Sequence, residues 1–179
     1  MGWITDAKRV DVAVYAAIAR TPTSALDTTM RRLSGAADWS RLNLLAAGVL
    51  ATAGGAPGRR AARLGLASVA ATATAVNVAV KPIARRQRPD RVLHGVPEAR
   101  HVRMPTSRSL PSGHTASAVA FATGAGYAMP LGALPLGLLA GAVGYSRVHT
   151  GVHYPGDVVA GALLGAAIAQ ATAYALDRR

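Results

Sequence analysis

The stretch VVAGALLGAAIAQATAYAL, from Val158 to Leu176, contains no charged residue and is long enough to cross a bilayer as one helix. A second uncharged run, from Thr115 to Ser146, is long enough for two such helices. Neither run lies at the N-terminus, so a cleaved signal peptide does not explain them. The sequence of 179 residues therefore predicts a single membrane-embedded domain.

Outward from these runs, the pattern predicts an all-α, polytopic transmembrane helix bundle with about five spans. Gly54 to Gly58 is a turn signal, and Pro82 ends or kinks the apolar segment that follows it. Residues 87–113 form a long polar connection, of a length usual for functional or disordered loops. Met129 to Pro135 is expected to form a further turn. The expected spans are 42–56, 61–80, 114–128, 136–146 and 158–176.

Residues 1–38 differ from the rest because charges interrupt every apolar run. Val10, Val14 and Ile18 recur at a helical interval, which predicts amphipathic helices. Such helices lie in the membrane interface with their apolar side in lipid. We therefore expect an amphipathic N-terminal arm, residues 1–38, beside a membrane-embedded domain, residues 39–179.

The composition limits the classes of function. The chain carries 20 Lys and Arg against 8 Asp and Glu, a net charge of +12. In a soluble protein this excess would indicate nucleic acid, but here the cations suit anionic headgroups and phosphate. A single Phe leaves little surface for base stacking, so no nucleic-acid partner is expected. Cysteine is absent, which excludes disulfides, thiolate metal ligands and a cysteine nucleophile.

Small residues recur at four-residue spacing in two of the apolar runs. Gly137 is followed by Gly141, and Gly161 by Gly165. This spacing lets transmembrane helices approach closely. Packing within one chain explains it more simply than a dimer does, so the oligomeric state stays open.

The first polar cluster, KPIARRQRP at residues 81–89, follows the second expected span. On its own it is explained by cations that anchor a helix to headgroups. A phosphate site, however, needs an ammonium and a planar guanidinium that converge on the oxygens. Lys81 and Arg88 are the candidates for this pair.

The second cluster is Pro111-Ser112-Gly113-His114, at the start of the third span. A hydroxyl, a glycine amide and an imidazole at a helix N-terminus form a receptor for an anion. The alternative is that Ser112 only caps the helix and His114 only lies at the interface.

The third cluster, SRVHTGVHYPGD, spans Ser146 to Asp157. An Arg at the membrane edge, here Arg147, is costly to bury and indicates function. His153 is a candidate nucleophile, with Asp157 holding its second ring nitrogen.

A competing interpretation uses the spacing H-x-x-x-H-x-x-x-D. On a continuous helix, His149, His153 and Asp157 would share one face and could bind a metal. Gly151 and Pro155 argue against such a helix. This leaves a metal-dependent membrane hydrolase as one alternative and a non-catalytic membrane scaffold as another.

Together the three clusters resemble the type 2 phosphatidic acid phosphatase superfamily. That superfamily includes membrane lipid phosphatases, soluble bacterial acid phosphatases and vanadium haloperoxidases. Its signature is K-x6-R-P, then P-S-G-H, then S-R-x5-H-x3-D, and the chain matches every fixed position. The resemblance covers residues 40–176 and favours the membrane lipid phosphatases, because the chain is too short for the haloperoxidase scaffold.

The resemblance implies a role for each matched position. His153 would be the nucleophile that forms a phosphohistidine, and Asp157 would orient it. His114 would protonate the leaving alkoxide and then activate water, with no cofactor or metal required. The residues that would hold the phosphoryl oxygens are Lys81, Arg88, Ser112, Gly113 and Arg147.

The substrate expected from this resemblance is a lipid phosphate. Phosphatidic acid, phosphatidylglycerol phosphate, a polyprenyl phosphate or pyrophosphate, and a polyprenyl phosphosugar such as decaprenylphosphoryl-5-phosphoribose all fit, and the motifs do not choose between them. Headgroup recognition is assigned to Arg100, His101 and Arg103 in the long loop.

The distribution of cations predicts an orientation in the cell (plasma) membrane. On the five-span arrangement, the face with the three clusters carries 15 of the 20 Lys and Arg, from residues 1–41 and 81–108 and from Arg147. The positive-inside rule therefore places the active site on the cytoplasmic face. Many bacterial relatives act instead on the outer face.

Overall fold

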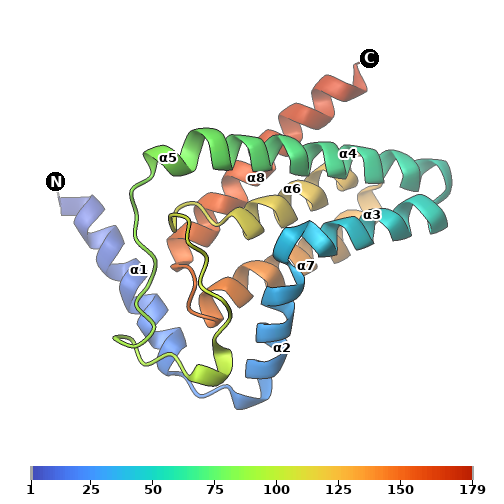
Figure 1. The fold of residues 1–179 in the computed structure, drawn as a ribbon. Helices are drawn as coiled ribbons and strands as arrows, with labels where there is room; N and C mark the ends of the chain where they lie inside the picture. Colours follow the sequence, from blue (N-terminus) through green and yellow to red (C-terminus); the bar gives the residue numbers. More distant parts are fainter. Residues whose placement is uncertain (1, 179) are drawn as a thin grey trace.

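The computed structural model describes residues 2–178, and it is built from helices joined by turns and one long loop (Figure 1). The helices in chain order are α1 (Gly2–Arg20), α2 (Ser24–Ala36), the 3-10 turn η1 (Asp38–Ser40), α3 (Arg41–Ala53), α4 (Gly55–Thr74), the π segment η2 (Ala75–Val80), α5 (Lys81–Ile83), the 3-10 turn η3 (Glu98–Arg100), α6 (Gly113–Ala128), α7 (Pro130–His149) and α8 (Pro155–Asp177).

Helix α6 lies at the centre of the bundle and packs against α4, α7 and α8. Small residues make this close packing feasible, as the sequence predicted. Any side chain at Gly161 or Gly165 of α8 would collide with the backbone carbonyls of Ser112 and Ala116 of α6. These two glycines therefore serve packing within the chain, whereas an added Cβ at Gly137 would meet no atom within 4 Å.

Three helices among the described residues are long and apolar enough to cross a membrane. They are Gly55–Ile83, Pro130–His149 and Pro155–Asp177. The five expected spans do exist as helices, but α3 has 13 residues and α6 has 16, which correspond to lengths of about 20 and 24 Å. Both are shorter than a hydrocarbon core of about 30 Å.

The turn expected from Met129 to Pro135 is wrong, because α7 already begins at Pro130. A proline at the first helical position lacks only an N–H that would have had no partner. Pro135 lies inside the helix and leaves the carbonyl of Leu131 without its usual donor. Leu131 is 92% exposed in the first turn of α7, so this carbonyl is not sealed in the core.

The polar end of the bundle is where the three sequence clusters meet. α4 and α7 end there, and α6 and α8 begin there. The opposite end joins the start of α4 to the end of α8, where Arg60 pairs with Asp177. A π segment precedes Lys81 and Pro82, and such wide helical turns occur frequently at functional sites.

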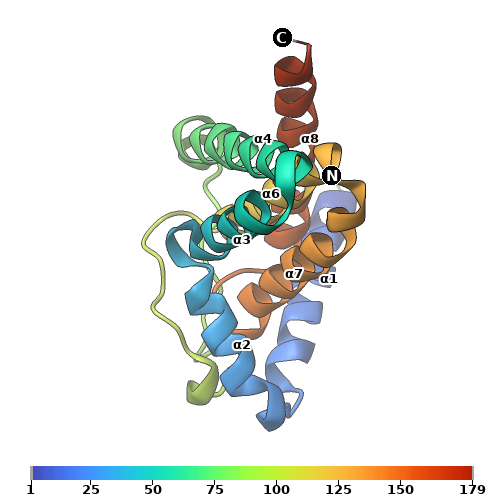
Figure 2. The same cartoon turned by 90° about the vertical axis from the view of Figure 1, so that its right-hand side faces the viewer.

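Helices α1 and α2 extend beyond the polar end of the bundle, where α2 packs on α7 and α1 packs on α7 and α8, and the loop of residues 84–112 runs along this part of the molecule (Figures 1 and 2). The segment expected to be an amphipathic arm is thus packed onto the domain. Tyr15 of α1 is fully buried in a cluster with Ala19, Val96 and Val148. Gly151, with φ 72°, turns the chain beneath Tyr15, where an added Cβ would come within 3.0 Å of the tyrosine hydroxyl.

Candidate active site

His153 lies in the short connection between α7 and α8 and is 1% exposed. Its Nδ1 is 3.4 Å from Oδ2 of Asp157, in the first turn of α8, and its Nε2 is 3.1 Å from Nη1 of Arg88. A guanidinium can only donate, so Nε2 accepts and Nδ1 carries the proton. His153 is therefore a neutral imidazole with its lone pair directed at Arg88.

Burial lowers the pKa of His153 to about 4. The hydrogen bond with Asp157 opposes this shift, whereas the charges of Arg88 and Arg147 add to it. The imidazole is therefore unprotonated at neutral pH, as a nucleophile must be.

Asp157 is fully buried and all of its contacts are with donors. Oδ2 accepts hydrogen bonds from Ser109 Oγ and, at 2.9 Å, from the Tyr154 amide, while Oδ1 accepts one from Arg86 at 3.1 Å. These donors fix the carboxylate in front of His153 and compensate its burial. The sequence predicted the pair His153 and Asp157 but missed Ser109 and Arg86.

Arg88 and Lys81 converge on the hydroxyl of Ser107, at 3.2 and 3.3 Å. Arg88 is held in place by carbonyls, with Nε 2.8 Å from Ser107 O and Nη1 2.8 Å from Val152 O. The Lys81 ammonium lies 3.4 Å from the position of a Cβ at Gly113, so a glycine there leaves room for the lysine. An ammonium, a guanidinium and a helix start are thus brought together, as the sequence predicted.

Ser112 caps α6 in extended conformation and is fully buried. Its backbone amide donates to Asp157 O at 2.9 Å, and its hydroxyl accepts from Thr115 at 3.0 Å. The starts of α6 and α8 are therefore tied to one another. This contact fixes the P-S-G-H segment relative to His153.

His114 is the more open of the two histidines. Its Nε2 is 2.8 Å from Oδ1 of Asp38, in the η1 turn that joins α2 to α3. No sequence pattern pairs these two residues, which lie 76 positions apart.

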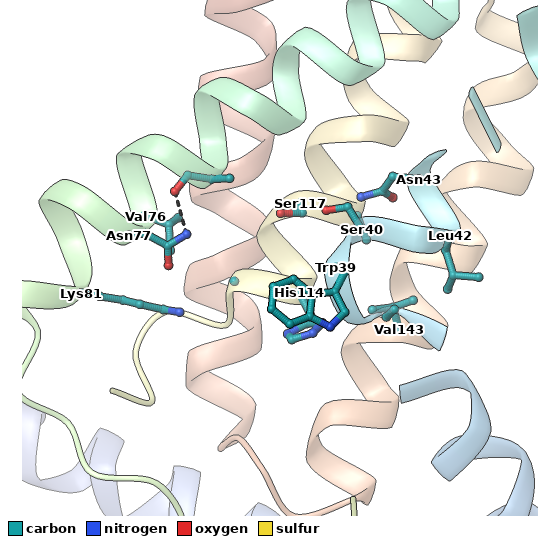
Figure 3. Close-up of a pocket in the computed structure, with 14 residues that line it drawn as sticks. Trp39, Ser40, Leu42, Asn43, Val76, Asn77, Lys81, His114, Ser117 and Val143 are labelled. Atoms are coloured by element: carbon teal, nitrogen blue, oxygen red, sulfur yellow. Dashed lines mark hydrogen bonds between the residues drawn. The ribbon is translucent and has the colours of Figure 1, made fainter. Parts of the chain in front are cut away.

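A cavity of about 230 Å³ adjoins His114, and Lys81 and Gly113 line the same space. Figure 3 shows this cavity with His114, Lys81 and Trp39 around it.

Arg147 is buried at the end of α7 and donates from Nη1 to the carbonyl and hydroxyl of Ser34, at 3.1 and 2.6 Å. Within residues 2–178 its Nε has no hydrogen-bond partner. A buried donor without a partner is costly, so this N–H is available for an anion.

Arg100 does not lie where headgroup recognition would require it, which corrects that expectation. It is 1% exposed and binds Asp27 Oδ1 at 2.8 Å, together with the carbonyl of Thr21 at 2.7 Å. Its charge is used to hold α2 to the long loop. His101 contacts the carbonyl of Val96 at 3.0 Å, and Arg103 is exposed.

The metal set proposed as an alternative is also not assembled. His149 turns toward α2, with Nε2 2.9 Å from Thr23 Oγ1 and 3.4 Å from Asp27 Oδ1. His153 instead faces Asp157 and Arg88. Nowhere between residues 2 and 178 do three or more His, Asp or Glu side chains form a group that could hold a metal ion.

The residues that sequence reasoning missed are mainly acidic. Asp11 pairs with Arg86 and accepts from the Gly156 amide at 2.7 Å, Asp27 pairs with Arg100, and Asp38 contacts His114. The chain has only 8 Asp and Glu at a net charge of +12. This scarcity could have indicated these residues, because each of the few carboxylates in such a cationic chain is expected to pair with a cation.

Comparisons with known proteins show the family of this chain. A family model described as the PAP2 superfamily matches residues 62–179. The decaprenylphosphoryl-5-phosphoribose phosphatase of Mycobacterium tuberculosis is 37% identical over 163 residues, which cover 89% of this chain and 84% of that protein. The protein with the same name from Mycolicibacterium smegmatis is 36% identical over 168 residues, covering 88% and 84%.

Two crystal structures share the fold. LpxE of Aquifex aeolicus aligns with a TM-score of 0.72 at 23% identity, covering 91% of this chain and 94% of its own. The transmembrane PAP2 type phosphatidylglycerolphosphate phosphatase of Bacillus subtilis aligns with a TM-score of 0.70 at 22% identity, covering 97% and 87%. With its family match, its relatives and its membrane fold in agreement, the chain belongs to the PAP2 superfamily, on the membrane lipid phosphatase branch.

Proposed function

We propose that this PAP2 phosphatase hydrolyses a phosphomonoester of a membrane lipid through a phosphohistidine on His153. The observation that carries the proposal is the state of His153: a buried, neutral imidazole with Asp157 at Nδ1 and a donor at Nε2. Arg88 now lies where a phosphoryl group would approach, so the same guanidinium can contact the phosphoryl oxygens.

The first step transfers the phosphoryl group to the enzyme. Nε2 of His153 attacks phosphorus, the P–O bond to the leaving alcohol breaks, and His114 gives a proton to the departing oxygen. Asp157 stabilises the positive charge that develops on His153. The contact with Asp38 orients His114 toward the departing oxygen.

The second step releases phosphate. His114 takes a proton from water, the water oxygen attacks phosphorus, and the P–N bond breaks to restore neutral His153. Charge on the phosphoryl oxygens is stabilised throughout by positioned donors, which is the main requirement of phosphoryl transfer. We assign this role to Lys81, Arg88, Ser112, Gly113 and Arg147.

The substrate we propose is a polyprenyl phosphosugar of the decaprenylphosphoryl-5-phosphoribose kind. The support is identity of 37% to proteins of that name over most of both chains. Phosphatidic acid, phosphatidylglycerol phosphate and polyprenyl phosphate or pyrophosphate are the competing substrates.

We further propose that α3, α4, α6, α7 and α8 all lie in the cell membrane as five spans, with α1 and α2 at its cytoplasmic surface. Support comes from the excess of Lys and Arg at the polar end of the bundle. The chain has no Cys, so an Ala99→Cys variant carries one label site in the long loop. A thiol reagent that cannot cross membranes should label this cysteine only in inverted vesicles. Labelling in intact cells would show that the loop lies on the outer face instead.

The experiment that tests the activity measures phosphate release from a panel of lipid phosphates by the wild type and by His153→Ala. We expect release that vanadate inhibits, that depends on His153 and that persists with a chelator. Radioactive phosphate should be trapped on wild-type protein as an acid-labile adduct. Release that a chelator abolishes would favour the metal-dependent alternative, and no release from any lipid would favour the scaffold.

A further inference from the structure

The cavity beside His114 is lined by both polar and apolar side chains. α3, the η2 end of α4, and α6 form its walls (Figure 3). Its lining includes Lys81, Gly113 and His114, so it opens directly onto the proposed catalytic groups. The polar and aromatic residues that line it without an assigned role are Trp39, Ser40, Asn43, Asn77 and Ser117.

These polar side chains have unused hydrogen-bonding capacity. Asn43 is 9% exposed, and its amide has no hydrogen-bond partner in the described part of the chain. Asn77 uses only its nitrogen, on the carbonyl of Ala73 at 2.9 Å, which leaves its oxygen unengaged. A buried polar group without a partner costs free energy, so the Asn43 amide, with the exposed Asn77 and the half-buried Ser117 on the same cavity, indicates a hydroxylated ligand.

The backbone at the edge of the cavity is strained. Trp39 and Ser40 both have φ of 57°, a left-handed conformation that costs non-glycine residues about 1–2 kcal/mol each. Such a backbone conformation persists only where the surrounding structure holds it in place, and it is frequent at functional sites. Here the two strained residues connect Asp38, which contacts His114, to the start of α3, where Asn43 lies. The indole of Trp39 lines the cavity.

From these observations we infer that the cavity is the leaving-group subsite and that it binds a hydroxylated sugar ring. The inference rests on the proposed function, because His114 protonates the leaving oxygen and the group bonded to that oxygen must lie beside His114. The amides of Asn43 and Asn77 and the hydroxyl of Ser117 would bond ring hydroxyls, and the indole of Trp39 would cover the apolar face of the ring.

The size of the cavity supports a small ring. About 230 Å³ lies below the range of about 300–1,000 Å³ that is usual for drug-sized ligands. A monosaccharide-sized group is therefore a better match than a branched or multi-ring headgroup. Recognition of the group next to the phosphate is thus assigned to this cavity instead of the 100–103 segment.

A kinetic test compares two lipids in phosphatidylcholine vesicles: a polyprenylphosphoryl pentose 5-phosphate and phosphatidic acid. The Asn43→Leu variant keeps the size of the side chain but removes its polar atoms. We expect the ratio of kcat/KM for the sugar lipid to kcat/KM for phosphatidic acid to fall about tenfold. The control Thr52→Val, on the same helix with a hydroxyl bonded only to Gly48 and Val49 carbonyls, should keep the wild-type ratio.

Equal losses on both lipids would overturn the inference, because Asn43 would then serve only the fold. An unchanged ratio would overturn it as well, since the amide would then not contact the sugar. If wild type instead releases no phosphate from either lipid, the proposed function fails while the subsite can still be tested by binding.

The binding test uses the fluorescence of Trp39. The chain has two Trp, and Trp3→Phe leaves Trp39 as the reporter. The phosphate-free polyprenylphosphoryl pentose should change the emission and saturate, whereas diacylglycerol should not, and Asn43→Leu should weaken binding of the sugar lipid at least fivefold. Identical responses to both lipids would show a lipid surface effect and refute the subsite.

Discussion

The two histidines of the site lie in contrasting surroundings. His153 is sealed, and its contacts with Arg88, Ser109 and Asp157 all lie within residues 62–179, the part that the PAP2 family model matches. His114 is half-open, and its partner Asp38 lies before that part of the chain. The contacts of the proposed nucleophile thus lie within the part that the family model matches, whereas the proposed acid His114 also depends on a residue before it.

The largest expected effect comes from removing the sealed histidine. His153→Ala should lower kcat for every lipid phosphate by at least ~10³-fold, because no other group can accept the phosphoryl group. The measurement is phosphate release at saturating substrate. His101→Asn is the matched control, and we expect less than threefold loss because His101 bonds only the Val96 carbonyl. Comparable losses in both variants would show that His153 is not the nucleophile.

The next effect concerns the ion pair between Arg100 and Asp27, which holds α2 to the long loop. Arg100→Met leaves Asp27 buried without its guanidinium, and breaking such a pair costs roughly 3–5 kcal/mol. We expect the free energy of unfolding in micelles to fall by about that amount. Arg103→Met, at an exposed position, should change it by less than ~0.5 kcal/mol. A small effect of Arg100→Met would mean that α2 is held without this ion pair.

The same contrast explains what the sequence could predict. The three clusters and their resemblance to the family predicted that Lys81, Arg88, His114, His153 and Asp157 meet at one face, since these residues lie at or beside the ends of apolar helices, and the structure gathers them at the polar end of the bundle. Asp38 and Asn43 were not predicted, because nothing local marks a carboxylate that contacts a helix 76 positions away or an amide that lines a cavity beside that helix.

Arg100 was misjudged for a related reason. An Arg in a polar loop usually faces solvent, but Asp27 and the carbonyl of Thr21 surround this one. The length of α7 was underestimated because Pro130 and Pro135 were both interpreted as turn residues, although the first begins the helix. Long-range polar contacts and the local context of proline are thus the parts that pattern alone does not determine.

Asp38→Asn sharpens the comparison between the two histidines. If Asp38 holds His114 ready to donate a proton, the variant should lose about tenfold in kcat on an alkyl phosphate, whose leaving oxygen needs that proton. On p-nitrophenyl phosphate, whose leaving group departs as an anion, the loss should be under about threefold. Asp38→Glu should restore part of the alkyl phosphate activity. Equal losses on both substrates would indicate that Asp38 acts only on the fold.

The smallest effect, per pH unit, is a pH dependence of stability to which the sealed histidine should contribute. His153 has a pKa of about 4 in the folded protein, set mainly by burial, against 6.5 in the unfolded chain. Between these values the unfolded chain binds the additional proton, so unfolding becomes easier as pH falls from 6.5 toward 4, by about 1 kcal/mol per pH unit. Above pH 6.5 both states are neutral at this residue and the slope vanishes. Melting temperatures in micelles from pH 7.5 to 4.5 should show this decline, and His153→Gln should make it shallower. An unchanged slope in His153→Gln would assign the decline to other groups and would mean that the ring of His153 is not sealed from water.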